Sequence, residues 1–129
     1  MVLLEDPLGY LKLAEKLSNL VADPNLKYSK ERTVIGRIYY GVFTYLKLKL
    51  YGSLVDQNIK HDKLRNDAQK QADKKGLDFN LKDQLRELEM LREHADYYRK
   101  IQIDGKSVTK TWSIYNILAD EFSKMWPDL

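Results

Sequence analysis

Two histidines and several arginines are the residues of this chain that could take part in acid–base or phosphate chemistry. His94 follows Arg92 by two positions and Arg86 by eight, and imidazole is the side chain suited to proton transfer near neutral pH. A lone histidine on a helical stripe is more often a core or interface residue, so both interpretations of His94 remain open. The other histidine, His61, stands between a lysine and an aspartate, which favours a surface position.

Arg37 and Asp96 form a second pair of interest, because each lies in an otherwise apolar neighbourhood. Burying either charge alone would be costly, which favours a hydrogen-bonded ion pair between them. The alternative is an Arg37 that faces a phosphate group. The nine tyrosines, among them Tyr40, offer stacking surfaces and hydroxyl groups, and most are expected in the core or at an interface.

Several classes of chemistry are excluded by what the sequence lacks. There is no cysteine, which excludes disulfides, cysteine-ligated zinc and iron–sulfur clusters. The sequence also has no Gly-rich phosphate loop, no metal-spaced histidine pair and no dinucleotide fingerprint, so we expect no metal site and no cofactor.

Length and charge indicate one domain over residues 1–129 with a mildly basic surface. The net charge is +3, and residues 29–55 hold five basic residues and one acidic residue, a net +4. This excess is either a solvated face with one buried arginine or a small phosphate-binding patch. No apolar run is long enough to span a membrane, and the acidic start is not that of a signal peptide. We therefore expect a cytoplasmic protein without membrane contact.

Apolar residues recur at three- and four-residue spacing in five segments, which predicts five helices and no strand. The segments run from Asp6 to Asp23, from Ser29 to Tyr51, over about 58–75, from Asn80 to Tyr98, and from Ser107 to Trp126. The expected N-caps are Asp6 (before Pro7), Ser29 and Asn80, and Gly52 and Gly76 are expected to end the second and third helices. The core stripe of the last segment is expected to hold Val108, Trp112, Tyr115, Leu118, Phe122 and Met125. The pattern predicts an all-α fold, an up-and-down antiparallel bundle of four to five helices.

The second segment is apolar nearly all round, so we expect it to be central or to line a dimer interface. Its two glycines, Gly36 and Gly41, would let a neighbouring element approach closely. Its least apolar stripe is Thr33, Arg37, Tyr40, Thr44 and Lys47.

Two stretches of this sequence resemble motifs of the HEPN domain family. Residues Arg32–Phe43 match the pattern R-x-x-I-x-R-x-Y-Y-x-x-F, and residues Leu91–Tyr97 match L-R-x-x-A-D-Y. The start of the third segment, His61–Leu64, looks like the H-K start of the intervening HEPN helix. The order of these motifs and the number of helices agree along the whole chain.

The resemblance implies a HEPN-like helical bundle that forms a homodimer. Members are commonly toxins or effectors that act on RNA, often beside a small nucleotidyltransferase partner, and others are binding or scaffold domains. Active members carry Arg and His separated by four to six residues on one helix. In this chain seven residues separate Arg86 from His94, and only one separates Arg92 from His94.

The expected function is therefore a nucleotide- or RNA-associated protein of toxin–antitoxin or defence type that binds rather than cuts. The alternative is a partner-binding or scaffold bundle without ligand chemistry. Were the protein an enzyme, it would be a metal-independent ribonuclease with His94 and Arg92 as catalytic residues. The residues expected to bind nucleotide or RNA are Arg37, Tyr40, His61, Asp96 and Tyr97.

Overall fold

Five α-helices make up the part of the chain that the computed structural model describes, which is residues 3–20, 26–52, 59–97 and 105–127. They are α1 (Tyr10–Asn19), α2 (Lys27–Tyr51), α3 (His61–Lys74), α4 (Leu81–Tyr97) and α5 (Gly105–Met125). Within these ranges there is no strand. The predicted all-α bundle is confirmed.

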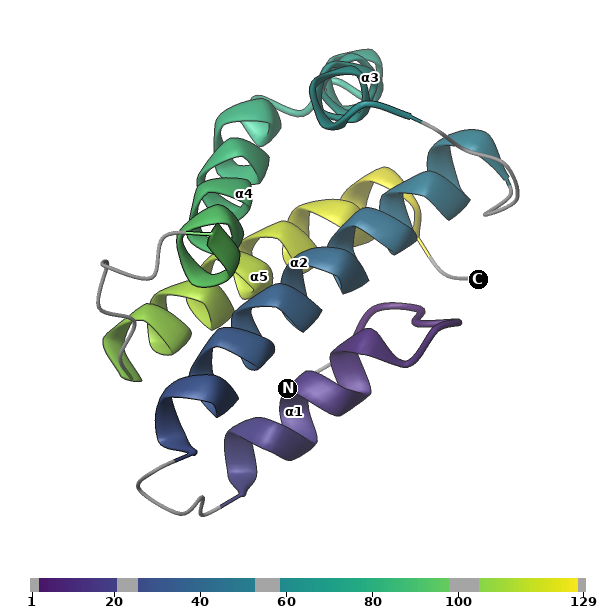
Figure 1. Ribbon diagram of the computed structural model, residues 1–129. Coiled ribbons are helices and arrows are strands. Elements are labelled where there is room, and N and C mark those ends of the chain that lie inside the picture. Colours follow the sequence, from purple (N-terminus) through teal and green to yellow (C-terminus); the bar gives the residue numbers. More distant parts are fainter. Residues whose placement is uncertain (1–2, 21–25, 53–58, 98–104, 128–129) are drawn as a thin grey trace.

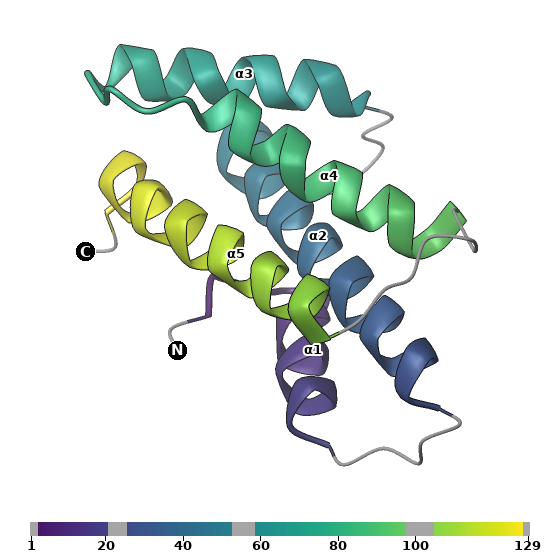
Figure 2. The ribbon, with the colours of Figure 1, turned by 90° about the vertical axis from the view of Figure 1, so that its left-hand side faces the viewer.

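Helix α2 is the centre of the bundle and contacts each of the other four helices. Helix α1 runs antiparallel beside it, and α4 and α5 run in opposite directions across its other side (Figures 1 and 2). Helix α3 departs from a simple up-and-down arrangement, because it lies across the C-terminal part of α2 and is seen end-on in Figure 1. The central position expected for the apolar second segment is thus confirmed.

The core is built from the faces that the apolar spacing predicts. In α5 the predicted stripe ends in Tyr115, Leu118, Phe122 and Met125, and all four side chains are fully buried. In α2 the buried residues fall on several sides of the helix, since helices pack around it. Burial of each large apolar side chain contributes roughly 1.5–3 kcal/mol, so this core is the main source of stability.

Helix α1 begins three residues later than the Asp6-Pro7 signal predicts. Gly9 adopts a left-handed conformation with φ 74°, and its N–H donates to the carbonyl of Asp6 in a turn. A residue in the left-handed conformation cannot continue a right-handed helix. The predicted helix therefore cannot run through Gly9, and α1 begins at Tyr10. Asp6 still caps the helix: its carboxylate accepts hydrogen bonds from the N–H groups of Leu11 at 2.9 Å and Lys12 at 3.1 Å.

The predicted starts of α2, α4 and α5 agree only in part with the structure. Ser29 is wrong as an N-cap, because α2 already begins at Lys27. Helix α5 likewise begins at Gly105, two residues before Ser107. Asn80 is confirmed as the cap of α4, and its side-chain oxygen accepts from the N–H of Asp83 at 3.2 Å.

The predicted C-terminal glycines of α2 and α3 are both confirmed. Gly52 and Gly76 follow these helices with φ 73° and 75°, a conformation that costs glycine little because it has no Cβ. Beyond Gly76, the N–H of Leu77 donates back to Ala72 at 3.0 Å.

The two glycines inside α2 face different neighbours. At Gly41 a Cβ atom would lie 2.5 Å from Cγ of Leu11, so the missing side chain is what lets α1 pack closely. At Gly36 a Cβ atom would lie 3.6 Å from Oδ1 of Asp96, an ordinary contact distance. Only Gly41 therefore serves close helix packing, while a Cβ at Gly36 would make an ordinary contact with the Asp96 carboxylate.

We expect Gly41→Ala to be less stable than Gly36→Ala by about 1–3 kcal/mol, because only the first substitution overpacks the core. Both remove a glycine from the interior of the same helix, so the gain of about 1 kcal/mol in helix propensity cancels in the comparison. Urea unfolding followed by circular dichroism measures the difference. Equal stability of the two variants would contradict the close contact between Leu11 and Gly41.

Candidate functional site

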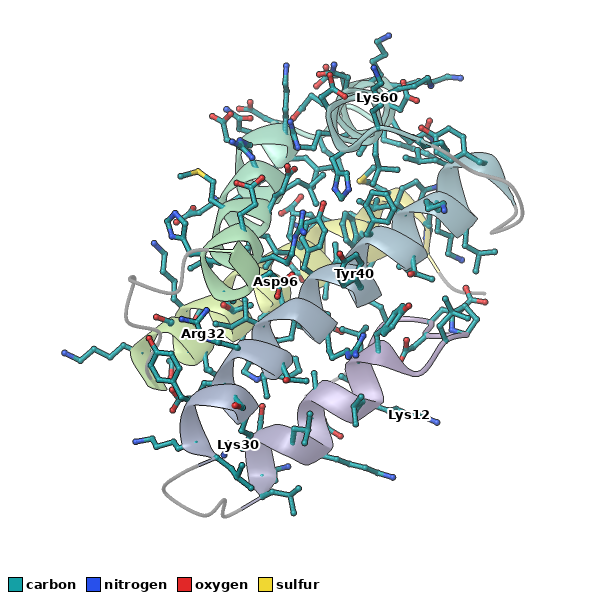
Figure 3. The ribbon with its side chains drawn as sticks, in the orientation of Figure 1. Lys12, Lys30, Arg32, Tyr40, Lys60 and Asp96 are labelled. Carbon is teal, nitrogen blue, oxygen red and sulfur yellow. The ribbon has the colours of Figure 1, made fainter. Side chains whose placement is uncertain are left out.

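A polar pocket of about 250 Å³ lies between α2 and the C-terminal end of α4. Its lining consists of Arg32, Thr33, Gly36, Arg37, Tyr40 and Asp96. Figure 3 shows Asp96 at the end of α4, between Arg32 and Tyr40 on α2. The five α2 residues share one face because they are spaced by one, three, one and three positions, close to the helical period of 3.6. Three of the predicted binding residues, Arg37, Tyr40 and Asp96, are thus brought together.

Arg37 contributes a half-buried cation to this pocket. Its guanidinium lies over the ring of Tyr10, with Cζ 5.5 Å from the ring centroid. Among the described residues, no carboxylate lies within ion-pair distance of it and no hydrogen-bond acceptor is in place. A guanidinium carries five N–H donors and stays charged at any ordinary pH, so Arg37 retains its capacity to bind an anion.

Arg32 supplies a second cation whose position is set by α4. Its Nη1 donates to the carbonyl oxygen of Ala95, and to that of His94 at 3.3 Å. These carbonyls belong to the last turn of α4, where the helix dipole favours a positive charge. The Arg32 guanidinium also lies 4.6 Å from the ring centroid of Tyr28. The bonds to the carbonyls join the two helices at the edge of the pocket.

The ion pair predicted between Arg37 and Asp96 is not formed. Asp96 instead pairs with Arg92, one turn earlier on its own helix, with 3.7 Å between Oδ2 and Nη1. A partner four residues away on the same helix is always within reach, whereas a pair between helices depends on how each is rotated. Arg37 and Asp96 line the same pocket without neutralising each other.

Arg92 and His94, the predicted catalytic residues, are not brought together. Arg92 is only 6 % exposed, and its guanidinium packs 5.1 Å and 5.6 Å from the ring centroids of Tyr39 and Tyr40. His94 is half-exposed and is not part of the pocket lining. Two positions along a helix correspond to a rotation of about 200°, so the two side chains leave α4 on nearly opposite sides.

His61 lies in a separate aromatic cluster between α2 and α3. Its ring stacks on Phe43 and Tyr39, with centroids 4.7 Å and 5.6 Å away, and its Nδ1 is hydrogen-bonded to the Tyr39 hydroxyl. Burial lowers the pKa of His61 and raises that of Tyr39. Both shifts favour the uncharged forms, a neutral phenol and a neutral imidazole. His61 does not line the pocket, and the side chain of Tyr97 is outside the described residues.

Three pocket residues, Arg32, Thr33 and Gly36, were not predicted as binding residues. The signal was present in the stripe of Thr33, Arg37 and Tyr40, which is the least apolar line along α2. Arg32 and Gly36 each precede one of these residues by a single position. The sequence does not show which side of this stripe faces α4, because that depends on how the two helices pack.

In the described part of the chain, no group of three or more His, Asp or Glu side chains is arranged to hold a metal ion. None of the described helices has the length and apolar character needed to cross a membrane.

No protein-family model, no curated protein and no solved structure matches this chain. The class defined by fold and site is thus an all-α bundle with an arginine-lined polar pocket.

We expect stability to fall on acidification more steeply for the wild type than for His61→Phe. The unfolded chain binds a proton at His61 near pH 6.5, whereas the folded chain has a lowered pKa there. Stability is therefore lost as the pH falls below about 6.5. The difference in slope should be below the one-proton maximum of about 1.4 kcal/mol per pH unit, because the ring is partly exposed.

Urea unfolding at pH 7.5, 6.5 and 5.5 measures this difference. The phenylalanine keeps an aromatic ring beside Tyr39 and Phe43 and removes the titrating group. It also removes the hydrogen bond to Tyr39, which lowers stability at every pH, so the comparison uses the slopes and not the absolute stabilities. Parallel pH profiles for the two proteins would show that His61 titrates alike in both states.

Proposed function

We propose that the pocket between α2 and α4 binds a phosphate-bearing ligand, a nucleotide or a segment of RNA. The observation that carries this proposal is the half-buried Arg37, which lines the pocket and has no carboxylate partner among the described residues. Arg32 provides a second positive charge, and the ring of Tyr40 provides an aromatic surface. Arginine and aromatic side chains together are the usual means of holding phosphates and bases.

The protein in this proposal binds and does not cut. Cleavage of RNA without a metal needs a base to deprotonate the ribose 2′-hydroxyl and a cation to stabilise the charge on the phosphate. The pocket offers arginines but no imidazole, since neither His61 nor His94 belongs to its lining. This agrees with the Arg–His spacing of the sequence, which departs from that of HEPN nucleases.

The wider biological setting follows from the HEPN resemblance and is part of the proposal. The protein would act in the cytoplasm as a homodimer in a toxin–antitoxin or defence system, with a nucleotidyltransferase as a partner. Its +4 segment, which includes Arg32 and Arg37, supports an anionic ligand.

A scaffold role without ligand chemistry is the second candidate function. The observation that favours it is a set of exposed leucines on and next to α1. Leu13 is 42 % exposed, and Leu8, Leu20 and Leu26 are between 56 % and 60 % exposed. Leucine side chains exposed on and next to one helix offer apolar surface to a partner protein. A protein that stays monomeric in light scattering across micromolar concentrations would count against this role and against the homodimer.

We expect Arg37→Gln to weaken the binding of nucleoside monophosphates and of a mixed-sequence RNA by about 10- to 100-fold, since a hydrogen-bonded charge pair contributes roughly 1.5–3 kcal/mol. Calorimetry at low salt is the measurement, because phosphate contacts are strongest there. Lys12→Gln is the matched control. It removes one exposed positive charge from α1, outside the pocket lining, and should change affinity little. Absence of binding by the wild type would overturn the proposal.

We further expect no cleavage of a labelled mixed-sequence RNA by the wild type in EDTA. His94→Ala provides the comparison, since His94 is the best candidate for a base in this chain. Cleavage by the wild type that is lost in His94→Ala would contradict a purely binding role. It would show that His94 and an arginine act together in spite of their positions on α4.

A further inference from the structure

Asp96 is the one residue of the pocket whose charge does not fit a ligand that is only a phosphate. A carboxylate repels a phosphate, yet Asp96 lies in the same lining as Arg32 and Arg37. Its ion pair with Arg92 is long, at 3.7 Å, and the Asp96 side chain is 34 % exposed. The pair uses Oδ2 and helps to compensate the buried Arg92 guanidinium, while Oδ1 takes no part in it.

The carboxylate of Asp96 retains nearly all its capacity to accept hydrogen bonds. Within the described ranges, no hydrogen bond reaches either of its oxygens, and an ionised carboxylate can accept about four. Its Oδ1 lies beside Gly36, where a Cβ would be 3.6 Å away. Gly36 places no side chain against this oxygen, and Tyr40 lies one turn further along the same face of α2.

The nucleobases differ in how well they match an ionised carboxylate. Guanine presents two adjacent donor groups on one edge, N1–H and the N2 amino group, which can donate to the two oxygens of one carboxylate in parallel. Adenine and cytosine each place a ring nitrogen acceptor beside their amino group, and uracil places its single N–H between two carbonyl oxygens. In these three bases an acceptor would face an oxygen of Asp96.

We infer that the pocket selects guanine nucleotides, with Asp96 as the residue that determines base specificity. The base would lie against Tyr40 with its N1–H and N2 amino edge on the Asp96 carboxylate, and the phosphate would be held by Arg37. This assignment rests on the proposed function. In this arrangement Arg37 faces the phosphate and the Asp96 carboxylate faces N–H donors of the base. A phosphate alone would leave Asp96 without a suitable partner.

The test compares four nucleoside monophosphates of equal charge, GMP, AMP, CMP and UMP, by calorimetry at low salt. A bidentate contact to the correct base corresponds to about 5- to 100-fold in affinity, so the wild type should bind GMP that much more tightly than AMP. The variant Asp96→Asn presents one acceptor and one donor, so its amide N–H₂ group would face one of the two guanine donors. Its preference for GMP over AMP should be lost.

Glu93→Gln is the matched control for the loss of charge. Glu93 lies three residues earlier on α4 and pairs with Arg86 at 3.4 Å, and it does not line the pocket. This variant loses the same negative charge from the same helix and should keep the wild-type preference for GMP. Circular dichroism verifies that both variants keep their helical content.

The wild-type panel can overturn the inference even if Asp96→Asn fails to fold. Equal affinities for the four nucleotides would remove guanine selection and leave the phosphate-binding function standing. With dGMP measured beside the four, a preference for GMP over dGMP without a preference among bases would assign Asp96 to the ribose 2′-hydroxyl and overturn the inference as well. If the folded wild type binds none of them, the proposed function fails together with the inference.

Discussion

The burial of one guanidinium, that of Arg92, constrains how α4 lies on α2. A charged group that is 6 % exposed must be compensated inside the protein, because its desolvation costs several kcal/mol. The compensation comes from the faces of Tyr39 and Tyr40 and from Asp96. A cation over an aromatic ring contributes about 2 kcal/mol or more when both are desolvated. The adjacent tyrosines of α2 are therefore as much partners of this charge as they are core residues.

The contact of Arg92 with the two tyrosines links two neighbouring regions, the aromatic cluster around His61 and the polar pocket. Through Tyr39 it extends to His61 and the start of α3, and through Tyr40 and Asp96 it borders the pocket. Arg92 is thus occupied in holding the helices together, and Arg37 and Arg32 are the cations that line the pocket. Because Arg92 makes these contacts, it does not lie beside His94, although the two residues are close together in the sequence.

Helix α3 is attached by polar contacts more than by apolar burial. Its buried residues are only Leu64, Ala68 and Ala72. Arg65 forms an ion pair with Glu89 of α4, which is 7 % exposed and is also 3.1 Å from Arg86. Two arginines around one buried carboxylate satisfy it from both sides, and such a network fixes the position of a helix that has little apolar surface.

The sequence by itself determined the features that depend on neighbours along the chain. Five helices, the glycine ends at Gly52 and Gly76, the Asn80 cap and the buried stripe of α5 all follow from spacing and backbone preference. Tertiary structure decided the features that depend on helix rotation and approach. These are the partner of Asp96, the assembly of Arg32, Gly36 and Arg37 into one pocket, and the separation of Arg92 from His94. The physical reason is that contacts between helices depend on packing geometry, which residues distant along the chain set together.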